Sequence, residues 1–138
     1  MRSYQADYAG WAEDTAKAIA DGRWSDIDRA ALIDEVESLG KQERQRVISR
    51  LTVLLTHLLK RQFQPAKHCR SWEATILEQR SRLRDLIDDS PSLQPVLPQL
   101  LDKAYSYARL RAVRETGLAL NTFPEQLPFS ASEIWGED

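Results

Sequence analysis

A group of polar residues in the middle of the chain could bind a ligand. Its members are His57, Lys60, Trp72, Thr75, Gln79 and Arg80. The imidazole of His57 can change its charge near neutral pH, and the basic side chains could attract an anion or an acidic helix. We treat these six residues as a candidate polar pocket. The alternative interpretation is that His57 and Lys60 belong to the solvated face of a helix whose other face is apolar.

Gln79 is the most unusual member of this candidate polar pocket. It lies seven residues after Trp72 and four before Leu83, which places it beside the apolar face of a helix. An amide that is buried without partners costs on the order of 1 to 3 kcal/mol. We therefore expect Gln79 to form a hydrogen bond with a backbone group or with a side chain of a neighbouring helix. Such a bond would either fix the register of two helices or line a ligand pocket.

Acidic residues near the N-terminus form a second candidate group. Asp7 and Asp14 flank the apolar face of one expected helix, and Glu35 and Glu37 flank that of the next. Carboxylates of this kind could hold a hard divalent ion. The alternative is that they pair with basic residues or are solvated. We keep Asp7 and Glu35 as a candidate acidic flank.

Histidine and cysteine are too few for most known metal sites. Two histidines and one cysteine exclude three-histidine and cysteine-based zinc sites. A di-iron bundle needs glutamate three residues before each histidine, where this chain has Leu54 and Pro65. His68 and Cys69 are adjacent, and adjacent side chains rarely converge on one substrate. Phosphate-binding and dinucleotide-binding motifs are missing as well, so the sequence predicts no metal and no cofactor.

Apolar residues recur at intervals of three and four, which predicts helices throughout and no sheet. A first helix should carry on one face Tyr4, Tyr8, Trp11, Thr15 and Ile19. It should end at Gly22, because glycine tolerates the left-handed conformation that ends many helices.

A second helix should begin at a capping box of Ser25 and Asp28 and end at Gly40. Its inward residues would be Leu32, Val36 and Leu39. A third, longer helix at 42–63 carries apolar residues over nearly half of its circumference, so we expect it to be the central helix. The residue before Pro65 is disfavoured in helical geometry, which ends the third helix.

The remaining chain predicts two further helices and a strap. Ser71 is a suitable N-cap for a helix at 72–88, and Gly117 should cap one at 98–116. Beyond Gly117, prolines interrupt the apolar residues, which predicts an extended strap. A short helix should then begin at Ser130, with Glu133 as its capping partner. The predicted fold is all-α: one domain over residues 1–138, a bundle of about five helices.

Charge is segregated along the chain although the net charge is only −2. Residues 1–40 carry a net charge of −5, residues 41–84 carry +8, and residues 85–138 carry −5. The composition, with 42% hydrophobic and 29% charged residues, is that of a globular protein. No apolar stretch approaches the roughly 20 residues that cross a bilayer, and the N-terminus lacks the apolar run of a signal peptide, so we expect a cytoplasmic protein with no membrane partner.

Three functional hypotheses follow. The first is an interaction module that binds another protein or itself, with exposed Trp24, Trp135 or Phe129 as anchors. The second is a nucleic-acid-associated protein that applies the basic 41–84 segment to phosphates, which requires a contiguous exposed basic patch that is not interleaved with acids. The third is an enzyme with a polar pocket around His57 and Gln79. We favour the interaction module.

Several motifs also resemble a known family. They comprise residues 54–60 (LLTHLLK), 64–65 (QP), 71–76 (SWEATI) and 79–80 (QR), with Tyr4, Asp7, Trp11, residues 22–24 (GRW) and 34–40 (DEVESLG). Together they resemble the bacterial domain-of-unknown-function family numbered twenty-nine, which is common in cyanobacteria. Asp34, Val36 and Arg61 depart from the residues that are more frequent there. The resemblance implies an all-helical bundle and supplies no activity.

Overall fold

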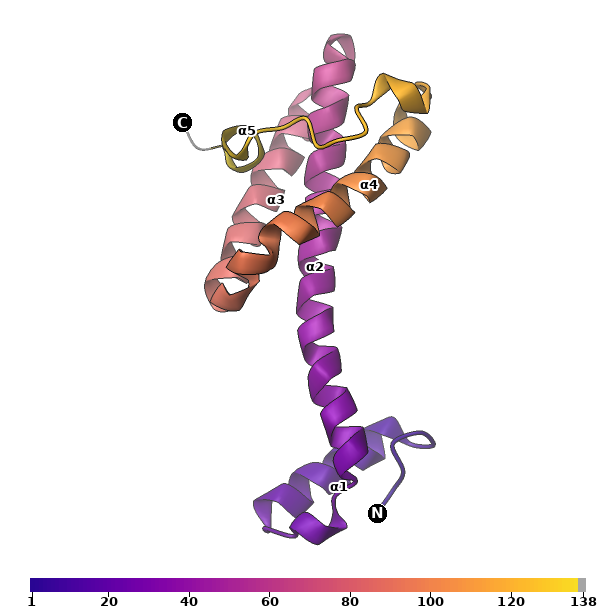
Figure 1. Ribbon diagram of the computed structural model, residues 1–138, viewed down its shortest axis with the longest axis vertical. Helices are drawn as coiled ribbons and strands as arrows, with labels where there is room; N and C mark the ends of the chain where they lie inside the picture. The colour runs from indigo at the N-terminus through magenta and orange to yellow at the C-terminus, as the bar shows by residue number, and fades with distance from the viewer. Residues whose placement is uncertain (137–138) are drawn as a thin grey trace. The chain divides into compact units, whose positions relative to one another are not determined.

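The computed structural model describes residues 1–136 and is all-helical, with 79% of residues in helices and no strand within that range. Its α-helices are α1 (Tyr8–Ala20), α2 (Arg29–Phe63), α3 (Arg70–Asp89), α4 (Leu97–Thr116) and α5 (Ala131–Trp135) (Figure 1). The all-α prediction is confirmed. Within residues 1–136, none of the helices combines the length and apolar character that crossing a membrane requires.

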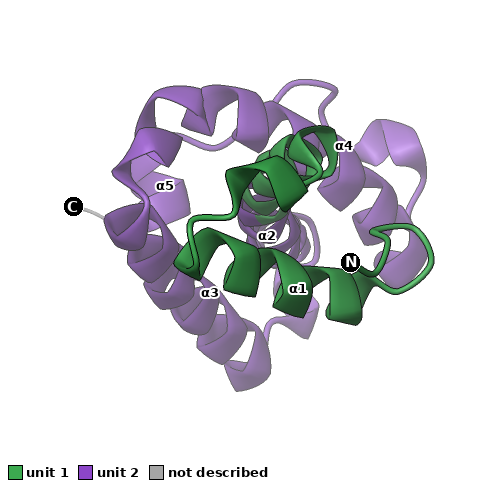
Figure 2. Ribbon diagram, turned by 90° about the horizontal axis from the view of Figure 1, so that it is seen from below, with its two compact units in different colours: residues 1–42 green, residues 43–138 purple. Residues whose placement is uncertain are grey.

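The chain divides into two compact units, residues 1–42 and residues 43–138 (Figure 2). The expectation of one domain over residues 1–138 stays a prediction, and each unit is described by itself.

In the first unit, α1 is capped at both ends by the residues that the local sequence supplies. The Asp7 carboxylate accepts a hydrogen bond from the Gly10 backbone N–H at 2.9 Å. Gly22, just beyond the helix, has a φ of +73°, which glycine adopts without strain. Trp11 and Thr15 are buried as expected. Tyr4 precedes α1 instead of lying within it, because the N-cap is Asp7 and the helix begins at Tyr8.

The two helices that we expected on either side of Gly40 are one continuous helix, α2, of 35 residues. The prediction that Gly40 ends a helix was wrong. A glycine inside a helix costs only about 1 kcal/mol, and no proline follows that would stop the helix. The prediction of a capping box at Ser25 was also wrong, because the Asp28 carboxylate itself accepts a hydrogen bond from the Ala31 N–H at 3.1 Å.

The expected inward face of the early part of α2 is mostly exposed. Val36 and Leu39 are 59% and 53% exposed and Ile33 is 50% exposed, while Leu32 is half-buried. We call Ile33, Val36 and Leu39 the α2 stripe. The side of α2 that faces the N-terminal segment instead presents Glu35, which accepts hydrogen bonds from the hydroxyls of Tyr4 and Tyr8. The hydrophobic pattern alone therefore did not predict which side of α2 faces the N-terminal segment.

The core of the second unit forms around the later part of α2, as the long apolar stretch predicted. Leu51, Leu54, Leu55 and Leu59 of α2 are fully buried. They share one core with residues of α3, α4 and the C-terminal segment, namely Ile76, Leu83, Leu100, Ala104, Ala108, Phe123 and Ile134. Figure 1 shows α3 beside α2 and α4 crossing it. The prediction of a central long helix holds for this unit.

The helix ends in the second unit agree with those predicted from the sequence, except at the start of α3. Cys69, not Ser71, is the N-cap of α3, so this prediction was wrong. Gly117 caps α4 with a φ of +74°. Ser130 and Glu133 form the predicted capping box of α5. Between α4 and α5 the chain runs as the predicted strap, with one short 3-10 turn at Leu120–Thr122.

Candidate functional site

The candidate polar pocket is divided into three separate contacts, and the first joins Lys60 to Trp72. The Lys60 ammonium lies 5.0 Å from the centre of the Trp72 ring, a cation–π distance. It also lies 3.7 Å from a carboxylate oxygen of Glu115 on α4. One turn earlier, His57 Nδ1 is 2.8 Å from the Val53 carbonyl oxygen. This contact ties α2 to α3 and α4.

The second contact joins Gln79 to Arg50. The Arg50 guanidinium of α2 donates a hydrogen bond to the Gln79 side-chain oxygen of α3 at 3.2 Å, and both residues are half-buried. The predicted bond to a neighbouring helix is therefore confirmed. Thr75, one turn earlier on α3, is half-buried as well.

The third contact joins Arg80 to the C-terminal helix. The Arg80 guanidinium donates to the carbonyl oxygens of Ile134 at 2.8 Å and Glu133 at 2.7 Å. Arg84, one turn later, donates to the carbonyl of Trp135. These carbonyls belong to the end of α5, where helical carbonyls lack intrahelical partners and cations are favourable. Arg80 thus turns towards α5, whereas Gln79 turns towards Arg50.

The titration of His57 is set by its surroundings. Partial burial is the main cause that lowers its pKa below 6.5, and the nearby Lys60 acts in the same direction. The unfolded chain therefore binds a proton at a higher pH than the folded chain. We expect stability to decrease as the pH falls below about 6.5, because only the unfolded state then becomes protonated at this position.

A urea-unfolding series between pH 7.5 and pH 5.5 would measure this dependence, with about 6.5 as the reference pKa of histidine. The variant His57→Gln should have a flatter profile. An unchanged profile, or a His57 ring that titrates above the normal value by NMR, would contradict the expectation.

The candidate acidic flank is not assembled as a pair. Asp7 caps α1, whereas Glu35 binds the two tyrosine hydroxyls. Desolvation and the hydrogen bonds to Asp34 and Glu35 raise the pKa of Tyr4 to about 12. Asp14 is held by Arg2, which donates to it at 2.9 Å. Within residues 1–136, no group of three or more His, Cys, Asp or Glu side chains is placed to hold a metal ion.

Cys69 is exposed at the N-terminus of α3. The Ser71 hydroxyl lies 3.2 Å from its sulfur, and this contact is the first cause that lowers the pKa of the thiol; the Trp72 backbone N–H acts in the same direction. His68 does not orient the thiol, because its ring nitrogen lies 2.8 Å from a carboxylate oxygen of Glu73.

Cys69 should therefore react with iodoacetamide at a lower pH than an ordinary thiol, because the thiolate is the reacting species. Ser71→Ala should move the rate profile to higher pH. The measurement is specific, since Cys69 is the only cysteine of the chain. Identical profiles for the two proteins would contradict the role of Ser71.

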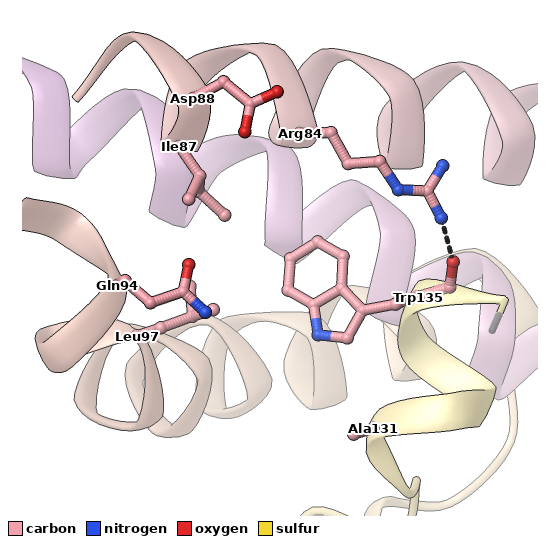
Figure 3. A pocket seen from close by; sticks show the side chains of 7 residues that line it. All are labelled: Arg84, Ile87, Asp88, Gln94, Leu97, Ala131 and Trp135. Carbon is pink, nitrogen blue, oxygen red and sulfur yellow. Dashed lines mark hydrogen bonds between the residues drawn. The ribbon is translucent and has the colours of Figure 1, made fainter. Parts of the chain in front are cut away.

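A pocket that the sequence did not predict lies beside the third contact. Its volume is about 480 Å³, and its lining residues are Arg84, Ile87, Asp88, Gln94, Leu97, Ala131 and Trp135 (Figure 3). The Trp135 ring projects into the space between α3 and α5, and the Arg84 guanidinium reaches the Trp135 carbonyl. None of the six predicted pocket residues lines it. The sequence feature that could have indicated this pocket is the four-residue spacing of Arg80 and Arg84, because it places both on the α3 face that meets α5.

Basic residues of the second unit are interleaved with acids and carbonyls. The ion pairs include Arg46 with Glu43, Lys60 with Glu115, Arg61 with Glu73 and Arg82 with Glu78. Arg80 and Arg84 bind α5 carbonyls. This is the arrangement that disfavours a contiguous phosphate-binding surface.

The three aromatic residues expected as protein-binding anchors differ in exposure. Trp24 is 68% exposed, which fits the expectation. Phe129 is buried and Trp135 is half-buried against the core, so neither is a free anchor. The predicted exposure of both residues was wrong, because the strap and α5 pack these apolar side chains inward.

The model of one protein family matches residues 3–138, nearly the whole chain, and its description is Domain of unknown function DUF29. This confirms the resemblance seen in the sequence. No curated protein and no solved structure matches the chain.

Proposed function

The chain belongs to the DUF29 family, a domain of unknown function, and from that premise we propose that it is a small helical interaction module that binds another protein or a second copy of itself. The observation that carries the proposal is the α2 stripe. Three apolar side chains that follow one another at three-residue intervals are each at least half exposed. Contiguous exposed apolar residues of this kind mark interaction surfaces.

The polar contacts of the second unit support the same proposal. Gln79, Arg80 and Lys60 each bind a different neighbour, so their side chains join helices instead of converging on one substrate position. A catalytic pocket around His57 and Gln79 has less support for this reason. Nucleic-acid binding by the 41–84 segment also has less support, because Arg46, Arg61 and Arg82 each pair with a glutamate.

The test is affinity purification of the tagged chain from its native cell. Val36→Ser together with Leu39→Ser removes apolar surface without changing the charge. A matched control is Leu77→Ser together with Leu110→Ser, because these leucines of the second unit are 62% and 61% exposed.

We expect proteins that co-purify with the wild type to decrease at least about tenfold with the stripe variant and to persist with the control. A second copy carrying a different tag counts among these proteins. If no protein co-purifies specifically, or if both variants retain the same partners, the proposal is wrong.

We also propose that the protein works in the cytoplasm. Its single cysteine and its high content of charged residues suit a reducing aqueous compartment. Fractionation of the native cell would place it with the cytoplasmic proteins.

A further inference from the structure

We propose that the pocket beside Trp135 binds a small organic cation, namely an ammonium group carried on an apolar body about as large as an aromatic ring. The pocket lies in the second unit and shares no residue with the α2 stripe, so the proposal goes beyond the proposed function. Its volume of about 480 Å³ is within the range of roughly 300 to 1,000 Å³ that is usual for ligand pockets.

The floor of the pocket is apolar. Leu97 is 7% exposed, and Ile87 and Trp135 are half-buried and pack against the core of the second unit. Figure 3 shows the Trp135 ring pointing from α5 towards Ile87 and Leu97. An indole ring offers a large apolar surface, and its face attracts cations more strongly than other aromatic side chains do. This floor suits an apolar ring that carries a positive charge.

The rim of the pocket carries a free carboxylate, that of Asp88. Arg84 lies four residues before Asp88 on α3, a spacing at which the two side chains can form an ion pair. The Arg84 guanidinium donates instead to the Trp135 carbonyl. Among residues 1–136, the Asp88 carboxylate therefore has neither a hydrogen bond nor an ion pair. It is exposed and accessible to the ammonium group of a ligand.

A second acceptor on the rim is the side-chain oxygen of Gln94. Within the part of the chain that the structure describes, the Gln94 amide has no hydrogen-bond partner either. An ammonium group has three N–H donors, so it can bind a carboxylate and an amide oxygen at the same time. Asp88 and Gln94 approach the same space from α3 and from the segment before α4 (Figure 3).

The charges around the pocket favour a cation over an anion. The carbonyl end of a helix carries a partial negative charge, at which basic residues are favourable and acids are not. The last turn of α3 nevertheless has no basic residue and ends with Asp88 and Asp89. Arg84 opposes a bound cation, but its charge is directed at the carbonyl of Trp135. A ligand cation would supply the positive charge that this helix end lacks.

The test uses phenethylamine, which is protonated at neutral pH, as the probe. It is titrated into the isotopically labelled full chain and followed by NMR. The chain has four tryptophans, and the indole N–H signal of Trp135 is assigned by its loss from Trp135→Phe. We expect saturable shifts of this signal and of the Ile87 and Leu97 amides, with a Kd on the order of 1 mM for a ligand of this size.

A pair of variants tests the role of the rim carboxylate. Asp88→Asn keeps the shape of the side chain and removes its charge, so binding should weaken about two- to fivefold, as for an exposed ion pair. Asp89→Asn is the matched control, because it makes the same change of charge at the next residue, which does not line the pocket. The control should change the Kd by less than about 1.5-fold. Equal losses in the two variants would overturn the proposal.

Three further probes test which chemistry the pocket selects. Phenethyl alcohol keeps the ring without the charge, hydrocinnamate reverses the charge, and butylamine keeps the charge without the ring. Each should bind at least about twofold more weakly than phenethylamine. Equal or tighter binding of any of them would overturn the proposed ligand class, and so would the absence of a saturable shift of the Trp135 signal. These outcomes leave the proposal about the α2 stripe unaffected, because that stripe lies outside the pocket.

Discussion

Phe123→Ala is expected to lower the free energy of unfolding by about 3 to 5 kcal/mol, which is the largest effect of any single substitution considered for this chain. The Phe123 side chain is only 1% exposed, and its ring and the Phe63 ring pack in a T-shaped arrangement at a centroid distance of 5.3 Å. Truncation to alanine removes the buried ring and leaves a cavity that the surrounding helices fill only partly.

The position of Phe123 explains why the effect should spread along the strap. Its carbonyl accepts a hydrogen bond from Arg109 Nε at 3.0 Å, and the next carbonyl, of Pro124, accepts one from the Tyr105 hydroxyl at 2.5 Å. Both donors lie on α4. When the ring no longer anchors the strap, these bonds should become easier to break.

Urea unfolding followed by circular dichroism would measure the loss. The control is Leu120→Ala, three residues earlier on the same strap, where the side chain is 42% exposed. We expect that control to change stability by no more than about 0.5 kcal/mol. Equal losses for the two variants would show that the strap is not held by Phe123.

Arg80→Met should release α5 at a cost of about 2 kcal/mol, because methionine keeps most of the apolar stem and removes both charge-assisted hydrogen bonds. The carbonyls of Glu133 and Ile134 would lose their donors. Since α5 has only five residues, its helix depends on tertiary contacts, and these two hydrogen bonds are part of them.

Hydrogen exchange is the sharpest measurement for this prediction, because it reports on α5 separately from the core. The backbone amides of Ile134 and Gly136, which bond to Ser130 and Ser132, should exchange faster in the variant. Arg82→Met is the matched control: Arg82 lies two residues later on α3 and pairs with Glu78 at the surface. If both variants leave α5 protected, Arg80 does not hold it.

The contrast between Gln79 and Arg80 shows how far the sequence reaches into the candidate site. The spacing of Gln79 from Trp72 and Leu83 predicted that its amide would bond to a neighbouring helix, and it does. Its donor, Arg50, lies 29 residues away in sequence. Periodicity shows which face a residue occupies, but it contains no information about which residue of another helix lies opposite. Because periodicity lacks this information, we grouped Arg80 with Gln79, although Arg80 binds a segment more than 50 residues later.

The most informative wrong prediction about the fold concerns the α2 stripe. Leu32, Val36 and Leu39 follow the spacing of a buried face, and we predicted that they would point inward. The structure turns Glu35 towards Tyr4 and Tyr8 and leaves Val36 and Leu39 exposed. A helical pattern shows that residues share a face, and it does not say whether that face is covered by the same chain or by another molecule.

The sequence by itself determined the helical class, the apolar part of α2, the Gly117 cap and the capping box of α5. Each of these depends on interactions within a few residues, such as side-chain caps, backbone conformation and apolar spacing. Only the tertiary structure decided that Arg80 and Arg84 hold α5, that a pocket lies beside Trp135 and that the α2 stripe is free. Those outcomes depend on which distant segments meet, because the energy of a long-range contact offsets or overrides a weak local preference.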